Sequence, residues 1–505
     1  MRGVVRACCL MATLAGCHPA KQSDVASPSE VGPVTLKGKI PITSRSVKAV
    51  ALYLRARALN ENLQPHEGYA LFQQAVALDP AFALGEYGLA LTAPTVKQAR
   101  EHLSRALALS QNVSDGERLL LLAMQARSDG DVIASRQRAE SLVTRYPDDE
   151  RAHWGLGNTM LAQQEYNEAV AQFQKAIAIN PQFSLAYNSV GYALRPTGNT
   201  GAAEKAFLQY IALVPNDPNP YDSYAELLLS MGRFDESIVQ YNKALSIDPH
   251  FSGSFVGIAA NHLLAGRYPS AIAEAERYFN LARDDHERRA ALLTLALVYV
   301  DSGATDEALR AMEREYNVAR AIGDTASMSD DVMSIGHILL EAGRVEAARD
   351  RFQHARTLVS ASSLSASSKA DCELTTHYNL ARVALATHDA ATAKVEADAF
   401  TSGAATRRSG DRVRQAHELN GLLLLEAQHF DRSLAEFTLA DQQNPSVLFA
   451  MAMAHDGKGE RSRADELMTL AIHQYTLPTF PYVFTRAKAK ILPGVRPATM
   501  RVTLP

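Results

Sequence analysis

The sequence is poor in cysteine and in aromatic residues, which limits what the chain can be. Its 505 residues include four cysteines, one tryptophan and 7% aromatic residues. Cys8, Cys9 and Cys17 lie at the N-terminus, so processing of that segment would leave Cys372 as the one free thiol and exclude an internal disulfide. We interpret Cys372 as buried and inert rather than reactive. The abundance of alanine and leucine favours helices over a β-sandwich.

The chain also lacks a large excess of either charge. Its formal net charge is -4, and removal of the first sixteen residues, which include Arg2 and Arg6, would change it to -6 by loss of two positive charges. A protein that binds nucleic acid normally carries a basic face. No nucleic-acid partner is therefore expected.

Catalytic and cofactor-binding motifs are missing as well. His286–Glu287 and His417–Glu418 lack the second histidine of a zinc-protease motif, and no GxSxG motif is present. Gly457–Gly459 lacks the flanking residues of a phosphate-binding loop. Fifteen scattered histidines do not indicate a metal site. Paired acids such as Asp148–Asp149 suit helix N-termini. We expect no enzymatic activity, no cofactor and no small-molecule ligand.

A regular spacing of prolines is the strongest positive signal. Pro147, Pro181, Pro215 and Pro249 follow one another at intervals of 34 residues. A proline cannot continue a helix, so each one marks the end of a helical unit. Asn180–Pro181 and Asp248–Pro249 are in addition turn-forming pairs.

Between these prolines, small and large apolar residues recur at equivalent positions. Three units, Glu150–Phe183, Ser184–Asp217 and Pro218–Phe251, share this pattern, which includes Gly157, Gly191, Ala169, Ala203, Phe173, Phe207 and Tyr241. Small residues allow two helices to approach closely, and the aromatic rings fill the space between units. The pattern resembles the tetratricopeptide repeat, a helix–turn–helix unit that must stack on its neighbours to bury its apolar face.

This resemblance implies an all-α fold, a right-handed α-solenoid of about ten such repeats. We expect an N-terminal array over residues 46–284, strongest at 150–251, and a C-terminal array with longer repeats over 285–476. Residues 477–505 form a basic, proline-containing tail. Such a tail can touch anionic lipid headgroups, or it can pack over the last repeat or fray.

Residues 1–17 resemble the signal peptide of a bacterial lipoprotein. Two arginines precede a short apolar stretch, and the run Leu14–Cys17 matches the lipobox, in which the cysteine receives the lipid. The resemblance implies lipidation of Cys17, with His18 after it favouring the outer membrane. Residues 18–45 contain four prolines and several serines, and we interpret them as a flexible tether.

In the tetratricopeptide family the first helix of each repeat lines a concave groove. Carried onto the three clearest units, the groove positions are Arg151, Trp154, Asn158, Leu161, Leu185, Asn188, Tyr192, Arg195, Asn219, Asp222, Glu226 and Leu229. Trp154, Tyr192 and Arg195 have the chemistry of binding hot spots. The alternative is that Trp154 and Tyr192 only pack against a neighbouring helix. The lysines of chaperone-binding members are missing, so a chaperone-tail receptor is not expected.

These features predict a non-catalytic, membrane-anchored scaffold that binds partner proteins or peptides in its groove. It would lie in the cell envelope, on the periplasmic side of the outer membrane, with a role in envelope assembly or secretion. The alternative function is an accessory subunit for cell-wall or polysaccharide processing.

Overall fold

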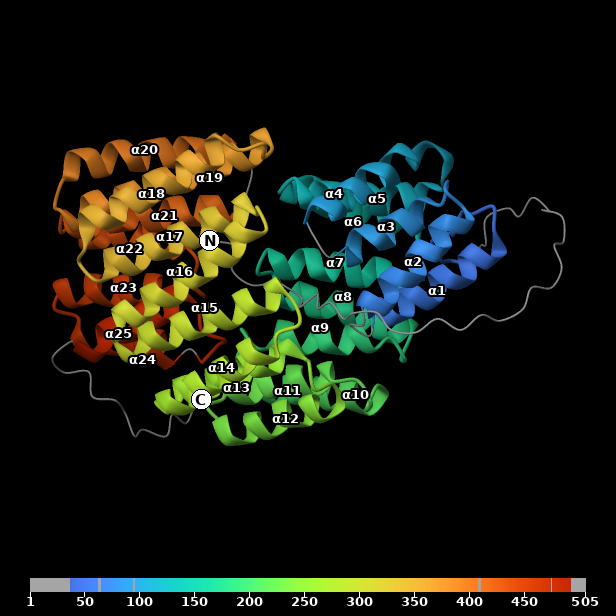
Figure 1. Cartoon of the computed structure of the whole chain (residues 1–505), viewed down its shortest axis with the longest axis horizontal. Helices are drawn as coiled ribbons and strands as arrows, with labels where there is room; N and C mark the ends of the chain where they lie inside the picture. Colours follow the sequence, from blue (N-terminus) through green and yellow to red (C-terminus); the bar gives the residue numbers. More distant parts are fainter. Residues whose placement is uncertain (1–36, 62–64, 94–95, 407–409, 474, 492–505) are drawn as a thin grey trace. The chain divides into compact units, whose positions relative to one another are not determined.

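Helices account for nearly all of the chain that the structure describes. The computed structural model describes residues 37–61, 65–93, 96–406, 410–473 and 475–491. These residues form twenty-five α-helices and one 3-10 turn, η1 (Ser110–Asn112), and contain no β-strand (Figure 1). The predicted all-α solenoid is confirmed.

The first ten helices pack as consecutive pairs, each helix with the next one along the chain. They are α1 (Val47–Glu61), α2 (Pro65–Leu78), α3 (Ala83–Thr92), α4 (Val96–Ala108), α5 (Asp115–Ser128), α6 (Val132–Arg145), α7 (Glu150–Ala162), α8 (Tyr166–Ile179), α9 (Ser184–Leu194) and α10 (Thr200–Leu213). Four helices of similar length follow, α11 (Asn219–Ser230), α12 (Phe234–Ile247), α13 (Ser252–Leu264) and α14 (Tyr268–Leu281).

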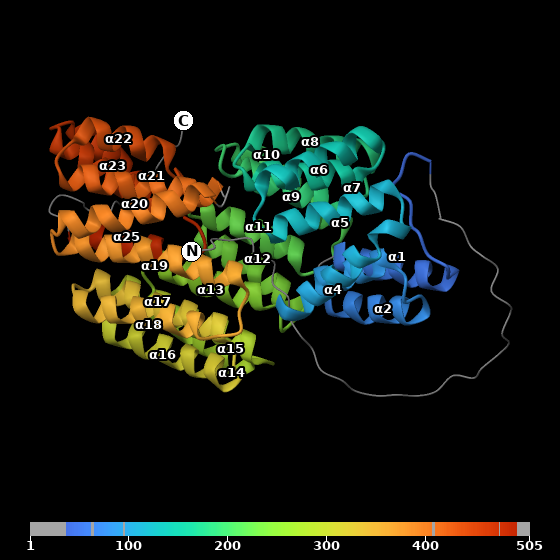
Figure 2. The same cartoon turned by 90° about the horizontal axis from the view of Figure 1, so that it is seen from above.

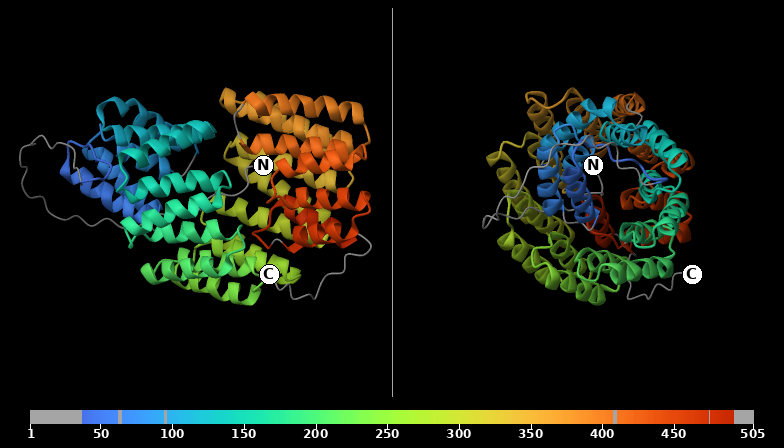
Figure 3. Two further views of the ribbon diagram at one scale, coloured as in Figure 1. Left: turned by 180° about the vertical axis from the view of Figure 1, so that it is seen from behind. Right: turned by 90° about the vertical axis from the view of Figure 1, so that its right-hand side faces the viewer.

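The last eleven described helices continue the pairing up to α23–α24, and α25 packs on this pair and on α15. They are α15 (Asp285–Ser302), α16 (Thr305–Ala321), α17 (Thr325–Glu341), α18 (Val345–Ser360), α19 (Ala366–Ala386), α20 (Ala390–Thr406), α21 (Gly410–Glu426), α22 (Phe430–Leu439), α23 (Pro445–Gly457), α24 (Arg461–His473) and α25 (Phe480–Ile491). Figures 2 and 3 show the same order of helices from other sides.

The described residues fall into two units. The N-terminal unit comprises residues 37–227 and 239–254, and the C-terminal unit comprises residues 228–238 and 255–491. The division thus lies within α11–α13, before the sequence-predicted boundary at residue 284. At that boundary the helices lengthen instead, from 14 residues in α14 to 18 in α15. Longer helices therefore explain the longer repeats of the C-terminal half.

The small and aromatic positions of each repeat meet as the pattern predicts. A Cβ atom built on Gly157 of α7 would lie 2.5 Å from the ring of Phe173 in α8, and one on Gly191 would lie 2.4 Å from the ring of Phe207. Both rings are buried. Glycine is needed here because a ring of the second helix lies directly against the backbone of the first.

The helix ends also follow the sequence pattern. Helices α8, α10 and α12 end two residues before Pro181, Pro215 and Pro249. At the first of these turns Asn180 Oδ1 accepts a hydrogen bond of 3.1 Å from the backbone amide of Gln182, and Asp248 does the same for His250 at 2.9 Å. These are the local side-chain turns that Asx–Pro pairs favour.

The prediction of a flexible tether over residues 18–45 is wrong for residues 37–45. We call residues 37–46, which precede α1, the entry segment. Its Ile42 is buried, and its backbone is hydrogen-bonded to acids of three repeats, as described below. Residues 18–36 and the predicted lipidation site Cys17 lie outside the described residues.

The basic tail predicted for residues 477–505 contains the helix α25. This helix contacts α23 and α24, which precede it, and also α15. The part of the tail that the structure describes is therefore packed against the repeats, and its cations are paired with acids. Residues 492–505 lie outside the described residues.

Within the described ranges, no helix combines the length and the apolar character needed to cross a membrane.

Candidate protein-binding faces

The predicted groove positions of the N-terminal unit lie on the consecutive first helices α7, α9 and α11. Trp154 in α7 is partly exposed, and its Nε1 donates a hydrogen bond of 2.9 Å to Ser189 Oγ in α9. Its ring meets Phe183 edge-on, with centroids 6.1 Å apart. Trp154 thus joins neighbouring repeats while remaining within reach of solvent.

The same arrangement recurs one repeat later. The hydroxyl of Tyr192 in α9 donates to Ser223 Oγ in α11 at 3.4 Å, and its ring packs edge-on against Phe207. The guanidinium of Arg195 lies 5.3 Å from the centroid of the Tyr192 ring and donates to Glu226 Oε2 at 2.9 Å. Two residues with hot-spot chemistry are therefore held in place before any partner arrives.

The remaining partly exposed groove positions on α7 are also held by local contacts. Arg151 donates from Nε and an η nitrogen to both carboxylate oxygens of Glu61, at 2.7 and 3.0 Å. Asn158 Nδ2 donates to the backbone carbonyl of Trp154 at 3.0 Å, and Leu161 packs on the apolar cluster between α7 and α8. The polar groups of this face are therefore preorganised.

Four of the predicted groove residues are buried, so the prediction that they line an open groove is wrong. Leu229 has no exposed surface and belongs to the core of the C-terminal unit. Leu185, Asn219 and Asp222 are each more than nine-tenths buried. Asn219 Nδ2 donates to the hydroxyl of Tyr210 at 3.0 Å. The neighbouring helices cover these positions, which a single repeat considered alone cannot show.

Asp222 is a buried acid beside a second acid on the same helix. Its Oδ1 accepts a hydrogen bond of 2.8 Å from Ser254 Oγ. Burial, together with the negative charge of Glu226 four residues on, raises the pKa of Asp222 to about 8. The neutral form of the Asp222 carboxyl is therefore favoured, and Glu226 Oε2 accepts the hydrogen bond from Arg195.

The entry segment shows how the N-terminal unit holds a non-helical stretch of chain. Its backbone amides donate to acids at three separate places along the array. Ile40 donates to Asp149 Oδ2 at 2.9 Å, Thr43 to Glu117 Oε1 at 2.8 Å, and Arg45 to Asp79 Oδ2 at 2.8 Å. Lys39 adds an ion pair with Glu150. Asp149 and Glu117 lie at the starts of the first helices α7 and α5, whereas Asp79 directly follows the second helix α2. Acids of separate repeats thus accept hydrogen bonds from the backbone of one segment.

Asp217, before α11, repeats the position of Asp149 two repeats later. Asp149 Oδ1 accepts from the amide of Arg151 at 2.8 Å, and Asp217 Oδ1 accepts from the amide of Asn219 at 2.9 Å. Asp149 Oδ2 binds the entry segment, whereas Asp217 Oδ2 is buried without a donor in the described part of the chain. Burial raises the pKa of Asp217 to about 6.

Asn188 on α9 supplies a second acceptor without a donor. Its Oδ1 is buried and has no hydrogen-bond partner among the described residues. A buried acceptor of this kind costs about 1–3 kcal/mol until a donor reaches it. Asn188 and Asp217 lie on consecutive first helices or at their starts, so this part of the N-terminal unit is suited to receive N–H groups.

The chemistry of the described residues beyond these faces is limited. No group of three or more histidine, cysteine or acidic side chains in the described ranges could hold a metal ion. The one described cysteine, Cys372, is buried, and burial raises the pKa of its thiol. A protonated, buried thiol reacts slowly.

Comparisons with known proteins agree with the repeat pattern. Residues 157–198 match a family model described as a TPR repeat, and residues 219–251 match one described as a tetratricopeptide repeat. Among curated proteins, the chain is 30% identical over 125 residues to the protein O-mannosyl-transferase Tmtc1 of Drosophila melanogaster, covering 24% of this chain and 15% of that protein. It is 27% identical over 167 residues to the cellulose synthase operon protein C of Xanthomonas axonopodis pv. citri, covering 32% and 11%.

A third relative is the small glutamine-rich tetratricopeptide repeat-containing protein 2 of Mycosarcoma maydis, 26% identical over 105 residues, covering 21% of this chain and 30% of that protein. The chain thus spans less than a third of the length of these relatives. Among solved structures, a tetratricopeptide repeat protein from Parabacteroides merdae has a TM-score of 0.35 at 14% identity, covering 54% of this chain and 94% of that one. A thermophilic TPR protein from Thermus thermophilus has a TM-score of 0.29 at 22% identity, covering 43% and 99%. Residues 157–198 and 219–251 are thus similar to tetratricopeptide repeats, and these two stretches contain all of the predicted groove residues except Arg151 and Trp154.

Proposed function

We propose that this chain is a non-catalytic scaffold that binds extended segments of partner proteins along the first helices of its N-terminal unit. One observation carries the proposal. The unit already holds a non-helical segment of its own chain through backbone amides, and Oδ2 of the equivalent acid two repeats later, Asp217, has no donor among the described residues. A partner strand that donates an N–H group to Asp217 Oδ2 would relieve this unpaired acceptor.

Side chains of the first helices α7 and α9 supply the rest of the contact surface. Trp154 and Tyr192 offer partly exposed aromatic surface on α7 and α9, and Asn188 offers an acceptor for a second amide. Large, rigid aromatic residues contribute most of the energy of typical interfaces. Because these side chains are already held by Ser189 and Ser223, a partner would order few of them on binding.

Substitution of Asp217 by asparagine tests the proposal directly. The asparagine Oδ1 retains the bond to the amide of Asn219, while a donor replaces the acceptor Oδ2. A hydrogen bond to a charged acceptor contributes about 1.5–3 kcal/mol, so we expect partner affinity to fall about 10-fold or more. Asp248→Asn is the matched control, because Asp248 caps a turn in the same way.

The partner is best captured in cells with a photo-crosslinking amino acid. Placed at Asn188 it should trap a protein that the same group at the exposed Lys175, on the second helix α8, does not trap. Trp154→Ala combined with Tyr192→Ala should abolish that product while the helical circular dichroism is kept. Equal crosslinking from both positions, or an unchanged product in the Asp217→Asn and the aromatic variants, would contradict the proposal.

We further propose that the chain is anchored in the cell envelope through a lipid on Cys17, on the periplasmic side of the outer membrane. The lipobox sequence supports this assignment. Labelled palmitate should be incorporated, and Cys17→Ser should release the protein from the membrane fraction. A Cys17→Ser variant that stays with the membrane would contradict the anchor.

A second candidate function is an accessory subunit for cell-wall or polysaccharide processing. The similarity to a cellulose synthase operon protein favours it, although the match covers 11% of that protein. Sedimentation of the purified chain with cell-wall glycan is the test, and a chain that stays in the supernatant would exclude direct glycan binding.

A further inference from the structure

The helix α25 covers the groove positions of the C-terminal unit. Asp301 of α15 and Glu341 of α17 lie four residues before the second helices of their pairs begin, one position after that of the predicted groove residue Leu161, which lies five residues before α8. Both acids pair with basic residues of α25. The face that the N-terminal unit leaves partly exposed is thus occupied here by a helix of the same chain.

The charges of α25 fit those of the face that it covers. Asp301 has no exposed side-chain surface; its Oδ1 accepts from Arg486 Nε and its Oδ2 from Lys490 Nζ, both at 2.8 Å. Lys490 also donates to the backbone carbonyl of Asp301 at 2.7 Å, close to the end of α15, where the helix dipole favours a cation. Lys488 lies 2.6 Å from Glu341 Oε2. The three basic residues of α25, spaced two residues apart, thus form ion pairs with the two acids Asp301 and Glu341.

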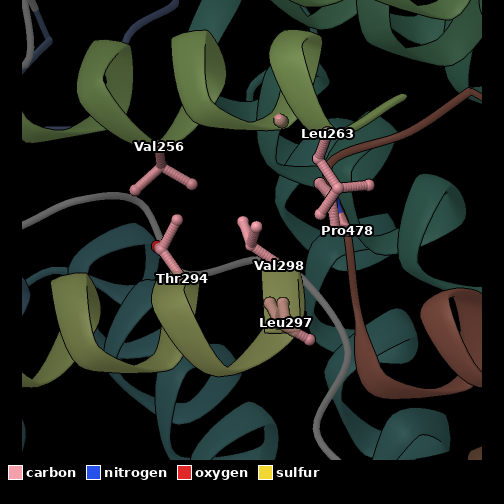
Figure 4. A pocket seen from close by; sticks show the side chains of 7 residues that line it. Val256, Leu263, Thr294, Leu297, Val298 and Pro478 are labelled. Carbon is pink, nitrogen blue, oxygen red and sulfur yellow. The ribbon is translucent and has the colours of Figure 1, made fainter. Parts of the chain in front are cut away.

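The apolar side of α25 completes the fit. Tyr482 and Val483 have no exposed surface, and the ring of Tyr475 meets that of Phe234 edge-on at 5.1 Å. The packing before the helix is less complete. A cavity of about 20 Å³ lies between α13, α15 and the residues before α25, and it is lined by Val256, Ala260, Leu263, Thr294, Leu297, Val298 and Pro478. Figure 4 shows these side chains. Aromatic residues and cations thus hold α25 against the repeats, whereas the residues that precede α25 leave a small cavity beside them.

Two features distinguish α25 from a repeat helix. It follows the complete pair α23–α24, and no second helix follows it within the described residues. It is also joined to α15 by ion pairs of Arg486 and Lys490 with the buried Asp301, and a buried charge left without its partner is costly. Complementary charges of this kind also fix the register in which a ligand helix binds a protein surface.

From these contacts we infer that the groove face of the C-terminal unit is a binding site for an amphipathic helix with aromatic anchors followed by alternating basic residues, and that α25 is its resident intramolecular ligand. A partner protein that presents a helix of this pattern binds the same site when α25 leaves it. The tethered α25 acts at an effective concentration on the order of millimolar, so the site is closed to weak competitors. This inference does not depend on the N-terminal unit.

The test uses the full chain with a protease recognition sequence inserted between His473 and Tyr475. After cleavage in the folded protein, a fluorescent peptide of residues 475–491 is added, and its binding is followed by fluorescence anisotropy. We expect the peptide to replace α25, with at least about 100-fold weaker binding to the uncut chain. A peptide with Arg486→Gln should bind at least about 10-fold more weakly, because Asp301 then loses its buried partner.

A peptide with Lys488→Gln is the matched control, since Lys488 is about half exposed and its partner Glu341 keeps a second ion pair with Arg382. Its affinity should change less than about 3-fold. Two outcomes would overturn the inference. One is a cut chain that keeps its helical circular dichroism but does not exchange α25, or that unfolds on cleavage. The other is equal binding of the Arg486→Gln and Lys488→Gln peptides.

Discussion

Replacement of Gly157 by alanine tests the packing rule on which each repeat depends. The new Cβ would lie 2.5, 2.7 and 3.0 Å from three ring atoms of Phe173, closer than carbon atoms approach in proteins. Because the ring is fully buried, either the ring or α7 must move. Such overpacking costs about 1–3 kcal/mol. The change from glycine to alanine in a helix recovers up to about 1 kcal/mol, so we expect a net loss of up to about 2 kcal/mol.

Gly155, two residues earlier in α7, provides the matched control. A Cβ at Gly155 meets no atom within 4 Å, so Gly155→Ala should stabilise the helix by about 1 kcal/mol. The difference between the two variants, about 1–3 kcal/mol, isolates the contact with Phe173. Phe173→Leu should rescue Gly157→Ala in part, because it removes ring atoms from the contact.

Native-state hydrogen exchange of α7 and α8 is the appropriate assay. An array of repeats does not unfold in one step, and a single melting temperature would average over both units. Amides of α7 and α8 should exchange faster in Gly157→Ala and more slowly in Gly155→Ala. If Gly157→Ala proved as protective as Gly155→Ala, close helix approach would not be the reason for the glycine.

Three further predictions concern titration, reactivity and the entry segment. The pKa of Asp222 is raised to about 8 in the folded state, so the folded state binds a proton more tightly than the unfolded state, and the contribution of Asp222 to stability falls as pH rises from about 4 to 8. Asp222→Asn should flatten this slope in urea titrations and stabilise the protein at pH 8. An unchanged slope would contradict the raised pKa. The thiol of Cys372 should react with a thiol reagent only after denaturation, so rapid labelling of the native chain would show that it is not buried. Asp149→Asn should remove the acceptor of the Ile40 amide and keep the cap on α7. Limited proteolysis should then cut within residues 37–46 and leave α7 intact. An uncut entry segment would show that Asp149 does not hold it.

The sequence by itself determined the repeating unit. Prolines spaced by 34 residues mark the helix ends, and pairs such as Gly157 with Phe173 specify which surfaces touch, because both signals act between residues close in the chain. The sequence pattern left open whether Trp154 and Tyr192 are available to a partner or only pack against a neighbouring helix. The structure shows that both side chains bond to the next first helix and stay partly exposed.

Only the tertiary structure decided which faces are covered. The burial of Leu229 and Asp222 depends on helices stacked from other repeats, which periodicity within one repeat does not report. The entry segment reaches Asp149 across 109 residues, and Arg486 reaches Asp301 across 185. Such contacts leave no periodic signal, since a lysine or an aspartate looks the same in sequence whether its partner is water or a distant helix. They form because the folded array brings acids of separate repeats to faces where the two ends of the described chain can bind.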